Sequence, residues 1–280
     1  MKRGLVYMAD DNPITSVHKN GCAGLMFAGI ISVFMIIQMM PIGSSAGAQD
    51  GKRDLIMTPL YDNRSSNKDL KTGWGFSCLI QGAEKTVLFD IGSDDAIMNM
   101  EKLNINPASI DVLVISHDHS DHTAGMPAFL KINKKAKTIF VPRESVKICE
   151  NVYTTGAMST SDREHKPFTK GTLENALIIR TAKGLVILTG CAHPGIVEMV
   201  QRAKSLFPKE SVYLVMGGFH LMNKSKKGVE KIVGDLKKEN VRKVAPGHCT
   251  GRIAESVFKE IYGADCIALE VGKLVIIEGR

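Results

Sequence analysis

The sequence of 280 residues lacks several features that mark particular protein classes. Its six cysteines are irregularly spaced and include no C-x-x-C pair, which excludes a disulfide scaffold. Aromatic residues make up only 6% of the chain, and no Lys/Arg block has aromatic residues interleaved with it. The net charge of +7 is then the only feature that favours binding to nucleic acid. Because charge alone does not indicate such binding, we expect no nucleic-acid partner. With 44% hydrophobic and 23% charged residues, the chain is otherwise an ordinary globular protein with a sizeable core.

No charged residue occurs between Lys19 and Asp50. This stretch contains an almost wholly apolar run at 25–40, then the helix breaker Pro41, then Ala-Gly-Ala at 46–48. The order of basic flank, apolar core and small-residue cleavage site is typical of a secretory signal.

We therefore expect residues 1–48 to be a signal peptide and residues 49–280 to form the exported domain, periplasmic or secreted after cleavage. In the alternative interpretation, residues 21–42 are not cleaved and anchor the protein in a membrane. In either case the first 48 residues do not contribute to the predicted fold.

After this segment, apolar runs alternate with stretches of helical spacing. The runs at 184–188 and 212–216 predict buried strands, and the apolar spacing at 228–240 predicts an amphipathic helix. The same patterns predict one helix at 123–132 and a strand at 266–269. Strands and helices in this order place the chain in the α/β class.

The most informative segment is 116–122, which reads S-H-D-H-S-D-H and holds three imidazoles and two carboxylates. It directly follows the apolar run at 112–115, which predicts a buried strand. The cluster is therefore expected on the loop that leaves this strand, where functional residues often occur. Imidazole nitrogens and carboxylate oxygens are ligands of zinc, and they also suit iron or manganese.

The spacing within the cluster predicts two neighbouring ions. His117 and His119 are two residues apart, so on an extended segment they point the same way and can bind one ion. Asp121 and His122 follow where the chain turns, and they would face a second ion nearby. Two ions need more ligands than this segment supplies, so other parts of the chain must provide them.

Two later histidines stand in comparable positions, since His193 and His248 each follow a predicted strand. H-x-H-x-D-H after an apolar strand, then Gly-Cys-Ala-His and Pro-Gly-His, resembles the metallo-β-lactamase superfamily of metallohydrolases. Further segments resemble its dihydropteroate-synthase-like branch, which includes ribofuranosylaminobenzene-phosphate synthases of pterin biosynthesis. These segments are TGCAHPGI at 189–196, GGFHL at 217–221 and PGHCTG at 246–251. The resemblance extends from about Asp54 to the C-terminus.

The resemblance implies a single domain with the four-layer αββα sandwich fold, in which two mixed sheets lie between outer helices. It also implies that loops along one edge supply the metal ligands. The ligands of the first ion would be His117, His119 and His193, and those of the second would be Asp121, His122 and His248. Zinc is the default ion, with one or two bound, and iron or manganese are alternatives.

Near the predicted ligands, the sequence matches the superfamily pattern at one position and departs from it at another. Asp90 matches an aspartate that supports the ligands, and it would accept the second N–H of a ligand histidine. By contrast, no carboxylate occurs between Gly217 and Lys224, where many members with two ions place a bridging aspartate. His220 stands in this segment, either as a ligand or as a group that hydrogen-bonds the substrate.

The least regular stretch is 150–171, and a long loop inside a compact domain is often functional. In the branch that the chain resembles, this region borders the mouth of the active site, so we expect Tyr153 and Thr154 to contact the substrate. Cys191 and Cys249 each lie near a proposed ligand histidine, and they are either additional ligands or small buried packing groups.

These observations predict a metal-dependent hydrolase. A metal-bound water would attack a small ester, phosphoester or lactone-like substrate, and Asp121 would take a proton from that water. The mildly basic net charge suits recruitment of an anionic small molecule.

Three alternatives stay open. The first is a pterin-related, ribofuranosylaminobenzene-phosphate synthase-like enzyme, which export would argue against because that biosynthesis is expected in the cytosol. The second is an exported protein that binds a metal or ligand without catalysis. The third is an iron-dependent redox enzyme on the same scaffold, although such relatives tend to use extra carboxylate ligands that this cluster lacks.

Overall fold

The structure is a computed structural model that describes residues 53–159 and 171–279. The predicted signal peptide lies outside the described residues, as does His165, so the expectations about export and cleavage stay predictions. Among the described residues, no helix combines the length and the apolar character that crossing a bilayer requires.

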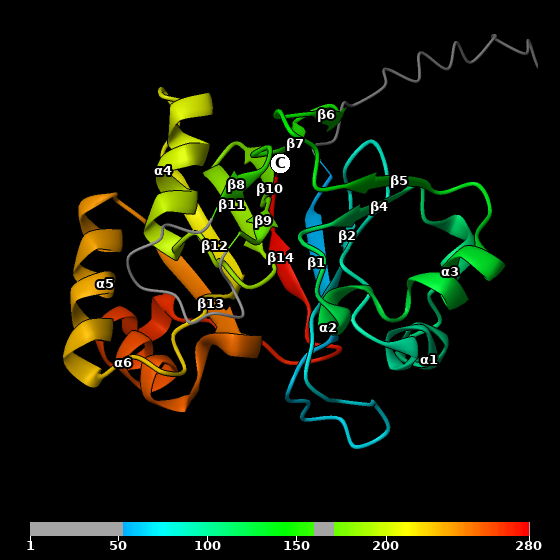
Figure 1. The fold of residues 1–280 in the computed structure, drawn as a ribbon, viewed down its shortest axis with the longest axis horizontal. Helices are drawn as coiled ribbons and strands as arrows, with labels where there is room; N and C mark the ends of the chain where they lie inside the picture. Colours follow the sequence, from blue (N-terminus) through cyan, green and yellow to red (C-terminus); the bar gives the residue numbers. More distant parts are fainter. Residues whose placement is uncertain (1–52, 160–170, 280) are drawn as a thin grey trace, which may run out of the picture. The chain divides into compact units, whose positions relative to one another are not determined.

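The first sheet has six strands in the order β14-β1-β2-β3-β4-β5 (Figure 1). Their bounds are β1 Leu55–Tyr61, β2 Ser77–Gln81, β3 Val87–Phe89, β4 Val112–Ile115, β5 Lys137–Phe140 and β14 Val275–Ile277. Strands β3, β4 and β5 are parallel, and the other neighbouring pairs are antiparallel. The strand that precedes the histidine cluster, β4, is buried along its whole length, because both faces of the sheet are covered.

The second sheet also has six strands, in the order β13-β12-β11-β10-β7-β6. Their bounds are β6 Lys147–Cys149, β7 Val152–Thr154, β10 Leu177–Thr181, β11 Gly184–Thr189, β12 Val212–Gly218 and β13 Lys243–Gly247. Strands β11, β12 and β13 are parallel, so their carboxyl ends meet at one edge of the sheet. Each of these ends leads directly to a predicted site histidine. A separate pair is formed by β8 (Met158–Ser159) and β9 (Leu173–Glu174).

Helices cover the outer faces of both sheets (Figure 1). Their bounds are α1 Asp94–Lys102, α2 Ser120–Thr123, α3 Met126–Ile132, α4 Ile196–Leu206, α5 Lys226–Lys238 and α6 Arg252–Tyr262. One apolar core lies between the sheets, a second joins the first sheet to α1 and α3, and a third joins the second sheet to α4, α5 and α6. Three cores between four layers confirm the αββα sandwich.

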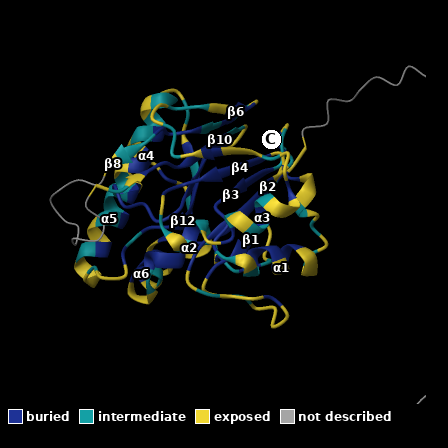
Figure 2. Ribbon diagram, turned by 45° about the vertical axis from the view of Figure 1, so that its right-hand side comes forward, coloured by how far each residue is buried: buried dark blue, intermediate teal, exposed yellow. Residues whose placement is uncertain are grey.

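The two faces of β4 show how the sequence produces this layering. Val112 and Val114 point into the core between the sheets, whereas Leu113 and Ile115 pack toward α1 and α3. A strand with apolar residues at successive positions is therefore buried from both sides, as its continuous apolar run predicts. Figure 2 shows the same pattern, with buried strands inside and partly exposed helices outside.

Three predicted elements differ in the structure. The segment 266–269 is not a strand, because the chain crosses from the outer core at Cys266 to the core between the sheets at Leu269 and makes only an isolated bridge. The predicted helix at 123–132 is divided into α2 and α3 at Gly125, where a Cβ would lie 2.6 Å from the Ser93 carbonyl oxygen.

The predicted irregular stretch 150–171 is the third difference. Its first ten residues contain β7 and β8, and residues 160–170 lie outside the described part. Strands of two and three residues are too short for a periodic pattern to show in the sequence.

Candidate metal centre

The structure brings the predicted ligand histidines together at the carboxyl ends of three strands, β4, β11 and β13. His117 comes from the loop after β4, and its ring centroid lies 4.2 Å from that of His122 and 4.7 Å from that of His193, after β11. The ring of His248, after β13, lies 4.9 Å from that of His122, although 126 residues separate the two in sequence. Two sheets thus contribute imidazoles to one buried cluster.

His117, His119 and His193 form the first group of donors. The Nε2 of His117 lies 3.1 Å from the Nδ1 of His119, and the rings of His119 and His193 are 4.9 Å apart. His117 and His193 are buried, whereas His119 is half-buried and borders a cavity of about 410 Å³. Its other lining residues are Asp118, Phe140, Val141, Gly171, Thr172 and Leu173.

Asp121, His122 and His248 form the second group. The Nε2 atoms of the two histidines are 3.2 Å apart, and the Asp121 Oδ2 lies 3.3 Å from the Nε2 of His248 and 3.7 Å from that of His122. Burial alone would raise the pKa of Asp121, but its hydrogen bond to His248 and the neighbouring His122 hold it well below its ordinary value. The carboxylate is therefore ionised at neutral pH and available to a cation.

The protonation of the histidines also suits a metal. Burial lowers the pKa of both His117 and His122 to about 3, so both rings are neutral at pH 7, and a neutral imidazole is the form that binds a metal ion. Several nitrogen and oxygen donors with little access to water thus converge on a small volume. Such a set is costly to bury without a cation, so the residues present fit one or two divalent ions.

Asp90 lies directly beneath the cluster and accepts three hydrogen bonds of 2.7 Å. The donors are the backbone N–H of Ser116, its hydroxyl group, and the Nδ1 of His122. The last contact leaves the Nε2 of His122 to face the centre. Asp90 is completely buried, and burial raises its pKa to about 7.

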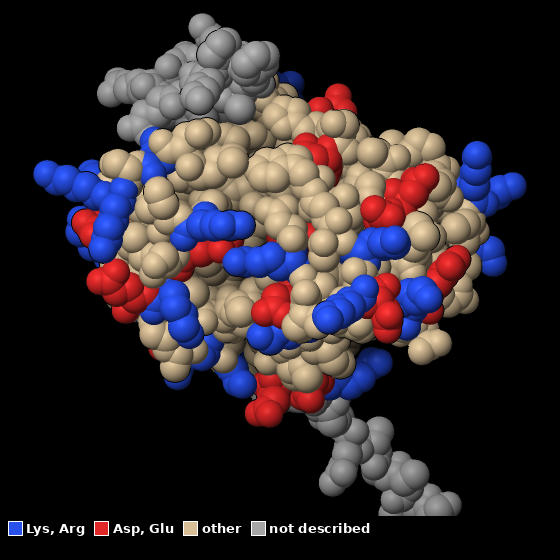
Figure 3. Space-filling view, turned by 90° about the horizontal axis from the view of Figure 1, so that it is seen from below, with Lys and Arg blue, Asp and Glu red and all other residues tan. Residues whose placement is uncertain are grey.

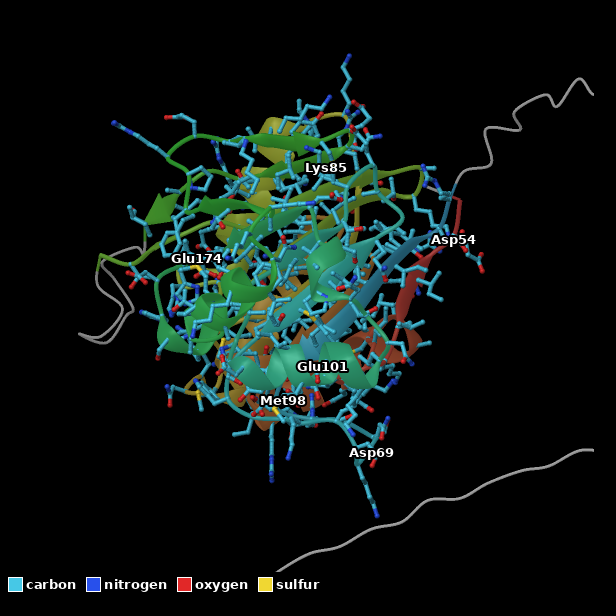
Figure 4. The ribbon with its side chains drawn as sticks, turned by 90° about the vertical axis from the view of Figure 1, so that its right-hand side faces the viewer. Asp54, Asp69, Lys85, Met98, Glu101 and Glu174 are labelled. Carbon is cyan, nitrogen blue, oxygen red and sulfur yellow. The ribbon has the colours of Figure 1, made fainter. Side chains whose placement is uncertain are left out.

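Glu174, which the sequence did not single out, supports the first group. It accepts 2.8 Å hydrogen bonds from the backbone N–H groups of Cys191, Ala192 and His193, and a fourth of the same length from the Nδ1 of His193. Burial opposes its ionisation, but His117, His193 and these hydrogen bonds hold the pKa of Glu174 well below its ordinary value. Figure 4 shows Glu174 among neighbouring side chains, whereas Asp69 lies at the outer edge of its loop. The one sequence signal is a lone carboxylate just before the apolar residues that begin β10.

Asp62 and Asn63, also not predicted, fix the loop that carries His248. The His248 backbone N–H lies 3.2 Å from both carboxylate oxygens of Asp62, and the Asn63 side-chain amide donates a 2.6 Å hydrogen bond to the His248 carbonyl. These contacts hold His248 in a left-handed conformation, with φ of +45°. Its Nδ1 is buried and has no hydrogen-bond partner among the described residues. The ring centroids of Trp74 and His248 lie 4.8 Å apart.

His220 is brought to the cluster as well, and its ring centroid lies 4.5 Å from that of His193. Cys191 and Cys249 lie beside it, with one donor atom of each of the three residues within 4.8 Å of the others. Both cysteines are buried free thiols. Burial raises the pKa of the Cys191 thiol well above its ordinary value.

Tyr153 and Thr154 are not brought to the cluster. The Tyr153 ring packs on Phe207, with centroids 5.0 Å apart, while Thr154 is fully buried and its hydroxyl accepts a hydrogen bond from the backbone N–H of Val146. Both side chains are engaged in the packing of β7, and the structure gives no support to their predicted contact with a substrate.

A cavity of about 900 Å³ lies among turns rather than at the histidines. Residues 82–84, 150–151 and 180–184 contribute to its lining, and no ligand histidine does. Because these turns join strands at the ends opposite to the ligand loops, this cavity is separate from the candidate metal centre.

Comparison with known proteins identifies relatives with this architecture. A sequence profile described as the metallo-beta-lactamase superfamily matches residues 74–198. The chain is 31% identical to the 7,8-dihydropterin-6-methyl-4-(beta-D-ribofuranosyl)-aminobenzene-5'-phosphate synthase of Methanocaldococcus jannaschii, over 79% of this chain and 95% of the relative.

Solved structures agree with these sequence matches. Tm1679, described as a metal-dependent hydrolase of the beta-lactamase superfamily, matches with a TM-score of 0.66 and 26% identity, over 80% of this chain and 99% of that one. YhfI from Bacillus subtilis, a metallo-beta-lactamase fold protein, has a TM-score of 0.56 and 12% identity over 81% of this chain and 100% of its own, a likeness of fold alone.

Proposed function

The chain belongs to the metallo-beta-lactamase superfamily, and from this premise we propose that it is a metal-dependent hydrolase of a small ester, phosphoester or lactone-like molecule. One observation carries the proposal. Donor atoms from three loops converge in two groups, and within each group the rings or donor atoms are close enough to share one ion.

The first group, His117, His119 and His193, would hold one divalent ion, and the second group of Asp121, His122 and His248 would hold another. Zinc is the ion that we propose, because neutral imidazole with a single carboxylate is a common zinc ligand set. A divalent ion in such a centre lowers the pKa of a coordinated water and polarises the bond under attack.

Asp121 is placed to handle the proton. Its side chain is 19% exposed, while those of His122 and His248 in the same group are 0% exposed. An ionised carboxylate at the border between the cluster and solvent can accept a proton at Oδ2 from an attacking water. His119, half-buried beside the 410 Å³ cavity, marks where a substrate would approach.

The charge of the molecule adds little to the choice of substrate. Figure 3 shows Lys and Arg side chains interspersed with Asp and Glu on the face seen there. The proposed substrate class includes small anionic molecules such as phosphoesters, because the M. jannaschii relative is named for a phosphate compound.

That relative also supplies the second candidate function. At 31% identity over 79% of this chain, it favours a synthase that acts on a pterin-like phosphate. Both candidates need the same metal centre, so they differ in substrate and not in ligands. Export of the mature protein would favour the hydrolase.

The test is an activity screen of the purified, zinc-loaded full chain against phosphodiesters, lactones, β-lactams and pterin-like phosphates. His117→Ala and His193→Ala should each lose most of the activity found and part of the bound metal. Glu230→Gln, on the exposed side of α5, is the control and should retain both. Unchanged metal content in both histidine variants would contradict the proposal, and turnover of pterin-like phosphates alone would favour the synthase.

A further inference from the structure

Cys191 occupies a place in the cluster that no other described residue shares. Its sulfur lies within 4.8 Å of the donor atoms of Asp121, His122 and His248, and it meets the same limit with His117 and His193. It is the one residue of the described part that belongs to both groups. The Sγ lies 3.2 Å from the Nε2 of His122.

The 3.2 Å between the Cys191 Sγ and the His122 Nε2 suits two ligands of one ion. Zinc binds sulfur at about 2.3 Å and imidazole nitrogen at about 2.0–2.1 Å, so two ligands of one ion lie no more than about 4.4 Å apart. In centres with two metals, the ions are about 3.5–4 Å apart. An atom close to the donors of both groups therefore lies between the two ion positions.

The loop that carries Cys191 is shaped to place the sulfur there. A Cβ at the preceding Gly190 would lie 2.1 Å from the Oγ of Ser116 and 3.0 Å from a carboxylate oxygen of Asp90, so only glycine allows the loop to close onto the residues beneath His122. From the other side, Glu174 accepts the backbone N–H of Cys191. The backbone that carries the thiol is held between Asp90 and Glu174, the two carboxylates that orient the ligand histidines.

The sequence offers no carboxylate after β12 that could take this bridging position. No carboxylate occurs from Gly217 to Lys224, so the segment after β12 cannot supply an oxygen that bridges two ions. Cys191 enters from the neighbouring parallel strand β11, whose end lies beside that of β12, where Thr189 pairs with Gly217.

We propose that the sulfur of Cys191 is a thiolate ligand shared by both ions, in place of a bridging carboxylate. The inference rests on the proposed metal centre and adds a ligand to it. The thiol gives up its proton to solvent when the sulfur binds. A shared thiolate favours zinc, iron or cobalt over magnesium and manganese, because soft sulfur ligands bind the former better.

X-ray absorption at the zinc edge of the fully loaded, full-length protein measures the sulfur directly. A shared thiolate contributes one sulfur to each zinc at about 2.3 Å, whereas a thiolate bound to a single ion contributes half a sulfur per zinc on average. We expect one sulfur per zinc. A value of one half would overturn the sharing, and the absence of sulfur would overturn the ligand itself.

Cobalt substitution identifies which cysteine is responsible. The wild type should show a sulfur-to-cobalt charge-transfer band in the near ultraviolet, and Cys191→Ser should lose this band and bind both ions at least about tenfold more weakly. Cys191→Asp should recover two ions without the band. Cys266→Ser, remote from the cluster, should keep the band.

The outcomes separate this inference from the proposed function. A band that persists in Cys191→Ser and disappears in Cys249→Ser would overturn the assignment while leaving the metal centre intact. Loss of part of the bound metal in His117→Ala and His193→Ala, with no sulfur at either zinc of the wild type, would support the metal centre and overturn the shared thiolate. If Cys191→Ser does not fold, the zinc-edge measurement on Cys249→Ser still decides, because one sulfur per zinc in that variant can come only from a shared Cys191 among the described cysteines near the cluster.

Discussion

Glu174 accepts two hydrogen bonds from His193, one from the backbone N–H and one from the ring Nδ1, each 2.8 Å long. The first fixes the chain at this residue, and the second fixes the tautomer, so that Nε2 faces the cluster. Because the same carboxylate also binds the two preceding backbone N–H groups, it holds the whole loop after β11. A buried charge thus organises a ligand loop and prepares its histidine for a cation.

Glu174→Gln should weaken this arrangement. Glutamine keeps one carbonyl oxygen, but its amide group would face an N–H donor, so the loop would retain at least one unsatisfied buried donor. We expect metal affinity to fall about 10–100-fold and stability to fall by about 1–3 kcal/mol. Competition with a chelator measures the first, and thermal unfolding of the metal-free protein measures the second.

Glu210→Gln is the matched control, because Glu210 pairs with Arg180 on a partly exposed surface. It should change stability by less than about 1 kcal/mol and leave metal affinity as it was. Equal effects of the two substitutions would mean that Glu174 has no special role in holding the ligand loop.

Removal of the metal should destabilise the whole domain. The ligands come from both sheets, so ions bound between them join the halves of the sandwich and bind only the folded chain. At free zinc about 1,000-fold above the dissociation constant, the linkage contributes about 4 kcal/mol, and 1 kcal/mol changes the unfolding midpoint by about 2–4 °C in a domain of this size. Chelation should therefore lower the midpoint by about 8–16 °C, as measured by calorimetry. Chelation of a variant with both His117→Ala and His193→Ala should lower the unfolding midpoint by less. An equal decrease would mean that the stabilising ion binds outside the candidate metal centre.

The histidines that the structure brings together could be predicted from the sequence because each is anchored to a local signal. His117, His119 and His122 lie within six residues of one another, directly after a continuous apolar strand, and strand ends explain His193 and His248. The αββα layering could be predicted only through the resemblance, since strand and helix order gives the α/β class and not the pairing of two sheets.

The residues that support the ligands were less accessible to prediction. Asp62 reaches His248 across 186 positions, and Glu174 reaches His193 across 19 positions from a strand of only two residues. Their roles depend on where separate elements pack, which no local pattern records. Asp90 was predicted because it occupies a recognisable position at the end of β3.

Cleavage of the leader is a prediction that the described residues do not address. The uncharged segment between Lys19 and Asp50, which ends in Ala46, Gly47 and Ala48, should be removed when the full chain is expressed in a cell that exports it. Mass spectrometry of the purified protein should then show Gln49 as its first residue. Ala48→Asp should block cleavage and leave the protein membrane-bound, whereas an intact N-terminus in the soluble wild type would contradict the signal interpretation.

Gly190→Ala should damage the centre without touching a ligand. An added Cβ would meet Ser116 Oγ at 2.1 Å, Ser116 Cβ at 2.7 Å and Asp90 Oδ2 at 3.0 Å. The methyl group must therefore push the Cys191 loop away from His122 or disturb the hydrogen bonds from Ser116 to Asp90. We expect a loss of stability of about 1–3 kcal/mol, as for overpacking of a tight core, and weaker binding of both ions.

Gly234→Ala provides the control, since it lies inside helix α5 with nothing within 4 Å of the added Cβ. Alanine is a better helix former there, so this variant should gain about 0.5–1 kcal/mol with unchanged metal binding. Urea unfolding together with metal titration of both variants measures the difference. If Gly190→Ala binds both ions as tightly as Gly234→Ala does, the close approach of the Cys191 loop to Asp90 is not needed to form the centre. Asp90 and Glu174 would then orient their histidines independently of each other.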